Sequence, residues 1–172
     1  MKKFRRILKE FAETIAMTTV VFLFLITFVI QGYKVYGSCM EPNLITGERL
    51  LGNKFIYRFE HPVRGDIVVF KYPPNPSKTF IKRIIGLPGE TVEIRKGKMY
   101  VNDRQLNEHP YVVNVPHGDY PRQKIPKGCV FVLGDNRDQS NDSRFWGDLP
   151  LKNIQAKAWV RYWPISRMEV FR

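Results

Sequence analysis

Cysteine is scarce in this chain of 172 residues and occurs only at Cys39 and Cys129. Two cysteines cannot build the disulfide framework that holds many small secreted domains together. Cys129 precedes the apolar run Val130-Phe131-Val132-Leu133, and this predicts a small buried residue at the start of a core strand. Pairing of the two thiols is geometrically open, but nothing in the pattern requires it.

Residues that bind metals are not clustered either. The three histidines (His61, His109 and His117) are scattered and lie beside proline or glycine, which predicts positions in surface loops. No set of histidines, cysteines and carboxylates has the spacing of a metal site. We therefore expect no metal ion and no cofactor.

Acidic residues are also few, with 16 Asp and Glu against 28 Lys and Arg, which gives a net charge of +12. A basic surplus can indicate a nucleic-acid partner, but the sequence has neither an arginine-rich helix nor an aromatic RNA-binding motif. Five basic residues stand before a long apolar run, and basic residues beside a membrane span attract anionic lipid headgroups. We expect anionic membrane lipids, and no nucleic acid, among the partners.

Apart from that apolar run, the sequence lacks segments with helical periodicity. Short runs rich in β-branched and aromatic residues alternate instead with proline, glycine and asparagine turns. Residues 107–128 contain several prolines and predict a long irregular surface segment. Short, numerous strands predict a mainly β protein: an N-terminal transmembrane helix followed by a curved, barrel-like antiparallel β domain. The expected strands are Leu50–Phe55, Asp66–Tyr72, Thr79–Ile85, Thr91–Arg95, Lys98–Val101, Val130–Leu133 and Ala156–Trp163.

The apolar run from Ile15 to Ile30 carries no charge. Counted back to Phe11 it reaches 20 residues, with Glu13 snorkelling, enough to cross about 30 Å of hydrocarbon. A cleavable signal peptide is the alternative, but its apolar core is usually about 7–15 residues and ends at a small-residue site, which is missing here. We expect a retained anchor over residues 14–31. The basic tail, residues 1–13, predicts a cytoplasmic N-terminus and an extracytoplasmic domain over residues 32–172.

Lys82 stands alone in the apolar strand Phe80-Ile81-Lys82-Arg83-Ile84-Ile85. Alternate side chains of a strand share a face, so Lys82 points the same way as Phe80 and Ile84. Loss of hydration favours the neutral amine over the ammonium, and a neutral lysine can act as a general base. Taken alone, a lysine at the edge of a half-exposed sheet is the simpler interpretation.

A second feature lies upstream, in Gly37-Ser38-Cys39-Met40-Glu41-Pro42-Asn43-Leu44. Small residues and a proline predict a tight, exposed turn. Such a turn can present a hydroxyl or a thiol to a substrate with a backbone N–H beside it. Gly-Ser turns are common, so this segment carries weight only together with Lys82 and a third segment.

That third segment is Gly134-Asp135-Asn136-Arg137-Asp138-Gln139-Ser140-Asn141-Asp142-Ser143-Arg144. Its alternating charges predict a hydrogen-bonded network, because arginine pairs with carboxylates in a bidentate, orienting geometry. With it, the chain resembles the type I signal peptidases, membrane-anchored proteases with a Ser–Lys dyad. The resemblance runs through four blocks in the family's order: Cys39–Leu44, Arg64–Phe70, Lys82–Glu90 and Gly134–Arg144.

The resemblance departs from the family pattern at the nucleophile. Aligning Met40 and Pro42 with the family's Ser-Met-x-Pro places Cys39 at the serine position and Ser38 one residue early. A shift of one residue would make Ser38 the nucleophile but would break the Met and Pro alignment, so we prefer Cys39. Asn43 also replaces the usual threonine.

The resemblance implies an enzyme of the bacterial plasma membrane that cleaves N-terminal signal peptides from exported preproteins. It implies Cys39 and Lys82 as the catalytic pair. It also implies supporting roles for Ser38, Ser140, Asp135, Asp142 and Arg144, with Ser140 close to the lysine amine, and substrate contacts for Met40, Pro42 and Leu44. We further expect apolar surface around Met40 and Leu44 to reach the bilayer.

Two other functions compete with this one. A self-cleaving repressor shares the Ser–Lys dyad, but it would need a DNA-binding helix-turn-helix and would carry no anchor. A membrane-anchored β domain that binds signal peptides without cutting them stays open, because Cys39 replaces the serine.

Overall fold

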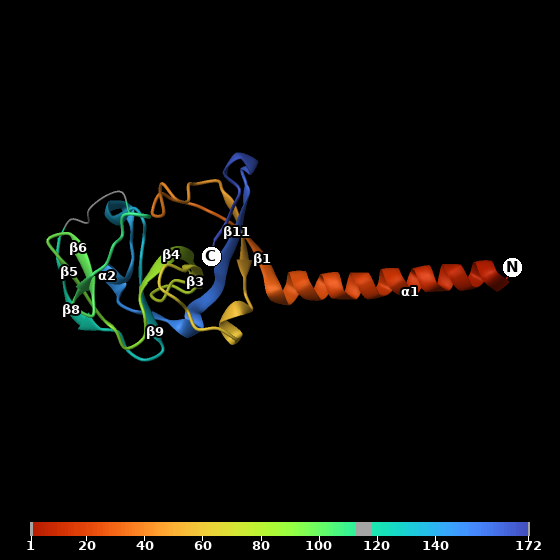
Figure 1. The fold of residues 1–172 in the computed structure, drawn as a ribbon, viewed down its shortest axis with the longest axis horizontal. Helices are drawn as coiled ribbons and strands as arrows, with labels where there is room; N and C mark the ends of the chain where they lie inside the picture. Colours follow the sequence, from red (N-terminus) through yellow and green to blue (C-terminus); the bar gives the residue numbers. More distant parts are fainter. Residues whose placement is uncertain (1, 113–117, 172) are drawn as a thin grey trace.

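The N-terminal helix stands apart from the β strands in the computed structural model, which describes residues 2–112 and 118–171. Helix α1 (Lys2–Phe24) continues into a π-helical turn (Leu25–Val29), and strand β1 (Ile30–Lys34) follows without a linker. The segment Lys3–Val29 is long and apolar enough to cross a membrane. Its large apolar side chains, such as Phe11 and Phe22, are exposed and have no protein cover. Figure 1 shows α1 projecting away from the sheets, as a membrane anchor would.

The larger sheet carries the centre of the molecule and is antiparallel throughout. Its strands follow the order β1-β2-β11-β3-β4-β9-β10, with β12 paired to β11. The longest strand, β11, pairs with β2 on one side and with β3 on the other, so a strand from the C-terminal part of the chain lies in the middle of the sheet. The bounds are β2 Arg49–Asn53, β3 Ile67–Lys71, β4 Thr79–Gly86, β9 Cys129–Leu133, β10 Leu149–Pro150, β11 Ile154–Trp163 and β12 Glu169–Val170.

The smaller sheet has the order β7-β6-β5-β8 and lies at the far end of the molecule from α1 (Figure 1). Its strands are β5 (Thr91–Arg95), β6 (Lys98–Val101), β7 (Arg104–Gln105) and β8 (Tyr120–Lys124). Strand β8 pairs with β5. The prediction of an irregular segment over residues 107–128 was therefore wrong at β8: backbone pairing along β5 forms a strand that the local sequence, with Pro121, does not indicate.

Short helical segments connect the strands. They include α2 (Ser143–Trp146) and four 3₁₀ turns: Ile56–Arg58, Arg137–Gln139, Leu151–Asn153 and Ile165–Arg167. The prediction of a mainly β protein is confirmed, and the strands over 91–95 and 98–101 have the expected bounds. Among the described residues the strands form two open sheets and no closed barrel, because β7 and β8 end the smaller sheet without meeting the larger one.

Three buried clusters hold these layers together. One lies between the two sheets and joins Val92 and Ile94 of β5 to Phe131 and Leu133 of β9. A second packs Val68 and Phe70 of β3 against Ile84 and Val132. The third underlies the segment between β1 and β2, and its buried members include Met40, Leu44 and Leu50. This third cluster fixes the turn that carries Cys39.

Gly86, the last residue of β4, lies where the two sheets meet. An added Cβ would come within 2.3 Å of Ile125 Cδ1 and 2.8 Å of Val92 Cγ1. Replacing Gly86 with alanine should lower the free energy of unfolding by about 1–3 kcal/mol, a typical cost of overpacking a core. Gly32→Ala is the control, since the nearest atom to its Cβ is 4.0 Å away. Urea unfolding of the full chain in detergent measures both; equal stability of the two variants would contradict this packing.

Candidate active site

A turn between β1 and β2 presents Cys39 at the surface of the larger sheet. Backbone hydrogen bonds from Glu41 N to Ser38 O (3.1 Å) and from Leu44 N to Met40 O (2.8 Å) close the turn. The side chains of Met40 and Leu44 are fully buried beneath it. Burial of two large apolar side chains stabilises this conformation by about 1.5–3 kcal/mol each. Cys39, between these anchors, remains partly exposed.

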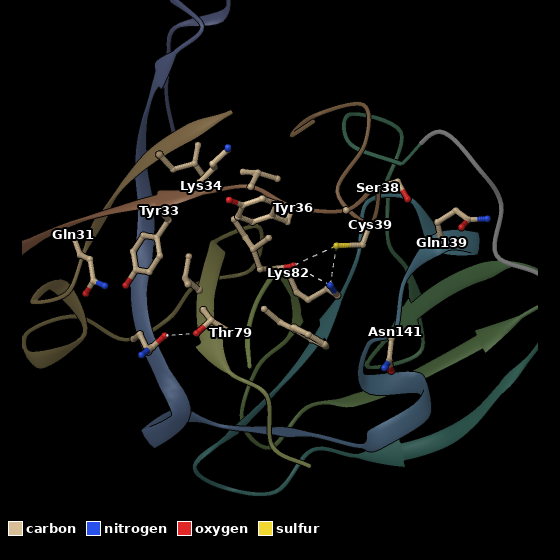
Figure 2. A pocket seen from close by; sticks show the side chains of 17 residues that line it. Gln31, Tyr33, Lys34, Tyr36, Ser38, Cys39, Thr79, Lys82, Gln139 and Asn141 are labelled. Atoms are coloured by element: carbon tan, nitrogen blue, oxygen red, sulfur yellow. Dashed lines mark hydrogen bonds between the residues drawn. The ribbon is translucent and has the colours of Figure 1, made fainter. Parts of the chain in front are cut away.

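The side chain of Lys82, on β4, contacts this turn at Cys39. Its Nζ lies 3.0 Å from Cys39 Sγ and donates a second hydrogen bond of 3.0 Å to Ile81 O (Figure 2). The residue is 3% exposed, and its Nζ lies 5.2 Å from the centre of the Phe80 ring. No ion pair with a carboxylate forms at this amine among the described residues. Lys82 is the one buried lysine among the described residues, and its amine is in direct contact with the Cys39 thiol.

A groove of about 710 Å³ opens beside this pair. Its walls come from β1, the Cys39 turn, β4 and β11, with Gln139 and Asn141 on the side of the charged loop (Figure 2). The side chain of Ser38 also lines the groove, but in Figure 2 its hydroxyl points away from Lys82. Cys39 and Lys82 both line the groove, so a molecule bound in it can reach Sγ.

Gly134, at the end of β9, allows the charged loop to approach the turn closely. A Cβ at this position would lie 2.3 Å from Ser140 Oγ and 2.5 Å from the carbonyl oxygen of Cys39. The same carbonyl accepts a hydrogen bond of 3.0 Å from Asn136 N. Ser140 is buried, and its hydroxyl has no hydrogen-bond partner within residues 2–112 and 118–171. The hydroxyl of Ser140, expected close to the lysine amine, therefore makes no hydrogen bond to Lys82, and it lies near the backbone of Cys39.

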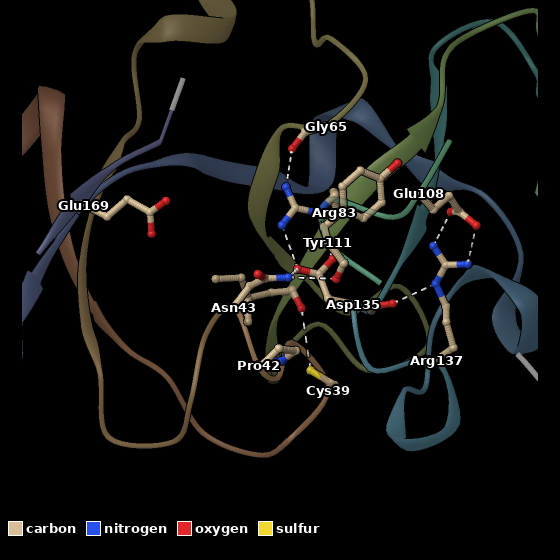
Figure 3. Close-up of polar contacts among 12 residues, drawn as sticks. Cys39, Pro42, Asn43, Gly65, Arg83, Glu108, Tyr111, Asp135, Arg137 and Glu169 are labelled. Carbon is tan, nitrogen blue, oxygen red and sulfur yellow. Dashed lines mark hydrogen bonds and ion pairs between the residues drawn. The ribbon is translucent and has the colours of Figure 1, made fainter. Parts of the chain in front are cut away.

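Asp135 joins the turn to β4. Its carboxylate accepts two hydrogen bonds from Arg83, of 2.8 and 2.7 Å, and one of 2.9 Å from Asn43 Nδ2. Arg83 also donates to Gly65 O, and Asn43 also donates to Tyr111 O (Figure 3). Asn43 and Arg83 were not among the predicted site residues. Arg83 could have been recognised as a second charge in an apolar strand, on the face opposite Lys82.

Asp142 and Arg144 brace the charged loop from within. Arg144 Nε and Nη2 lie 2.8 and 2.9 Å from the carboxylate oxygens of Asp142, which also accepts a bond from Gly134 N. A fully buried arginine, Arg137, donates to Gly134 O and pairs with Glu108. The predicted network of alternating charges is therefore present, and it fixes Gly134 against the turn.

The residues expected to contact substrate lie elsewhere. Met40 and Leu44 are fully buried, so neither offers surface to a substrate or to a bilayer; both are core residues because the turn must be anchored. Pro42 is exposed, but it does not line the groove. Cys129 is partly buried against the cluster between the sheets, and both cysteines are free. His61 and His109 are exposed as expected, whereas His117 lies outside the described residues. Among the described residues no group of metal-binding side chains occurs.

Comparisons with known proteins point in one direction. The family model "Signal peptidase, peptidase S26" matches residues 8–163. A signal peptidase I of Leptolyngbya laminosa is 39% identical over 168 residues, 94% of this chain and 82% of the relative. Signal peptidase I V of Bacillus subtilis is 43% identical over 136 residues, 71% of this chain and 79% of the relative. The crystal structure of a signal peptidase I from Enterococcus faecalis has a TM-score of 0.50 and 33% identity, and it covers 57% of this chain and 97% of its own.

The two thiols should differ in reactivity. Burial raises the pKa of Cys129, and the Asp148 carboxylate raises it further; Lys152 has a smaller opposing effect. Near pH 8 a smaller fraction of Cys129 is therefore thiolate than for an unperturbed cysteine. Cys39 is partly exposed and lines the open groove, where a reagent can reach its Sγ. We expect iodoacetamide to label Cys39 at least tenfold faster, measured by peptide mass spectrometry. Cys39→Ser should leave only the slow reaction; equal rates at both sites would contradict this assignment.

Proposed function

The chain belongs to the signal peptidase family, peptidase S26, and we propose that it cleaves signal peptides from exported preproteins with Cys39 as nucleophile and Lys82 as general base. One observation carries the catalytic assignment: the contact of 3.0 Å between Sγ and Nζ at the edge of an open groove. A nucleophile within hydrogen-bond reach of its base is the arrangement that covalent catalysis needs.

The reaction proceeds in two halves. Sγ attacks the scissile carbonyl carbon while Nζ takes the thiol proton. The C–N bond then breaks, Lys82 returns the proton to the leaving amine, and the acyl group stays on Cys39 as a thioester. Water attacks the thioester, its proton passes through Lys82, and the thiol is regenerated. The backbone N–H of Cys39 is the expected donor to the oxyanion, a role whose loss typically costs about 10²–10³ in rate.

The supporting residues act on this pair through the turn. Asp135, with Asn43 and Arg83, ties the turn to the strand that carries Lys82. Asp142 and Arg144 hold Gly134 against the carbonyl of Cys39. Ser38 lines the groove and is adjacent to the nucleophile. A displacement of about 1 Å in such a site can lower the rate about 10²-fold, so contacts that hold the pair in place support turnover.

The substrate lies extended in the groove, along strand residues of β1 and β4, in the manner of a peptide added to a sheet. Helix α1 anchors the protein in the plasma membrane, with residues 1–13 cytoplasmic and the domain from residue 32 extracytoplasmic. The basic residues of the tail face anionic headgroups. Two of them already form exposed ion pairs, Arg6 with Glu10 and Lys9 with Glu13, and such exposed pairs contribute little by themselves.

Cleavage of a preprotein in detergent tests the catalytic pair. Lys82→Ala should reduce turnover by about 10²–10⁴, the usual contribution of a general base, and circular dichroism should show a folded protein. Cys39→Ala should be equally inactive, and Cys39→Ser should cut without sensitivity to thiol reagents. Ser38→Ala is the comparison variant and should keep far more activity than Cys39→Ala. An essential Ser38 with a dispensable Cys39 would overturn the assignment, and binding without cutting by the parent chain would favour the silent binding domain.

The proposed orientation has its own test. Protease added to intact spheroplasts should digest residues 32–172 and spare the N-terminal tail, because the positive charges of the tail favour the cytoplasmic side. Detergent-permeabilised cells provide the control in which both parts are accessible. Full protection of the domain in intact spheroplasts would contradict this orientation.

A further inference from the structure

The C-terminal hairpin contributes two arginines to the turn that carries Cys39. Arg161 lies on β11, and Arg167 ends the 3₁₀ turn that leads to β12. Arg161 Nη1 donates to the carbonyl oxygen of Asn43. Arg167 Nη2 donates to the carbonyl oxygens of Pro42, at 2.9 Å, and of Asn43, at 3.2 Å. Backbone carbonyls three and four residues after Cys39 are therefore held by a segment more than 100 residues further along the chain.

Glu48 orders the two guanidinium groups. It is 1% exposed, and its two carboxylate oxygens lie 3.2 Å from Arg161 Nη1 and 3.1 Å from Arg167 Nε. The same carboxylate accepts a hydrogen bond of 3.1 Å from Ile45 N. Arg161 Nη2 also pairs with Glu169 of β12, at 2.6 Å. Two positive and two negative side chains balance in this cluster, so the arginines remain charged without an uncompensated buried charge.

We propose that Arg161 and Arg167 are positioning residues that clamp the Cys39 turn and set the direction of Sγ toward Lys82. The charged loop holds the turn on its other side, through the bond from Asn136 N to Cys39 O. With the peptide groups of Pro42 and Asn43 fixed, the turn has little freedom to rotate between these two supports. The proposal rests on the proposed function only for its effect on turnover; the clamp itself is a property of the turn.

Part of this clamp lies beyond the part of the chain that the family model covers. The match ends at residue 163, whereas Arg167 and Glu169 follow it. The guanidinium is suited to the role because its donors have a fixed planar arrangement, which lets Arg167 bind Glu48 and two carbonyls at once. A lysine offers a single ammonium at the end of a flexible chain and can replace only part of this pattern.

Hydrogen exchange combined with turnover tests the clamp on the full chain in detergent. In Arg167→Ala, the amides of Glu41 and Leu44, which close the turn, should exchange at least tenfold faster, while amides of β3 and β4 keep their rates. For the proposed cleavage, kcat should fall about tenfold with KM unchanged, because the substrate groove is left intact. Arg167→Lys should lie between the parent and the alanine variant in both measurements.

Arg122→Ala is the matched control. Arg122 is an exposed arginine with a two-pronged carboxylate pair, 2.7 and 2.8 Å from Asp103, and its strand belongs to the smaller sheet. It should leave exchange in the turn and kcat unchanged. Unchanged exchange of Glu41 and Leu44 in Arg167→Ala overturns the clamp, as does a uniform rise across all strands. Faster exchange in the turn with an unaltered kcat overturns the positioning role. If the parent cuts no preprotein, the proposed function fails, and the exchange rates still decide the clamp.

Discussion

The contact between the Cys39 thiol and the Lys82 amine is the interaction on which the rest of the site depends. It joins two residues 43 positions apart, one on a turn and one in a strand. A turn is the more mobile partner, because fewer backbone bonds hold it. Most of the surrounding structure can be understood as a means of keeping the turn in place: two buried side chains beneath it, the charged loop on one side and the arginines of the hairpin on the other.

The charged groups near the site serve this purpose more than they serve the substrate. Asp135, Arg83 and Asp142 are directed at backbone groups and at one another, and none of them lines the groove. Buried ion pairs gain little net stability over apolar packing, but they fix geometry when all their hydrogen bonds are made. The polar network therefore contributes less to net stability than to a defined orientation of the Cys39 thiol.

Much of this arrangement could be predicted from the sequence. The isolated lysine in an apolar strand, the turn around Cys39 and the loop with alternating charges were each recognisable, and their order along the chain indicated the family. Strand β8 was missed because its pairing along β5 is a tertiary effect. Met40 and Leu44 were assigned to the substrate although they are buried; an apolar residue in a turn next to a nucleophile can face either way, and only packing decides. Arg161 was visible as a charge within an apolar strand, but its partners lie in the turn and could not be identified.

The direct passage from helix to sheet has a consequence for where the enzyme can work. Strand β1 begins one residue after the π-helical turn ends, and its residues form part of the groove. The chain from Ile30 to Cys39 can span at most about 30 Å even when fully extended. If helix α1 spans a membrane as proposed, the Cys39 thiol lies within that distance of the end of the helix, so the proposed cleavage takes place close to the lipid surface.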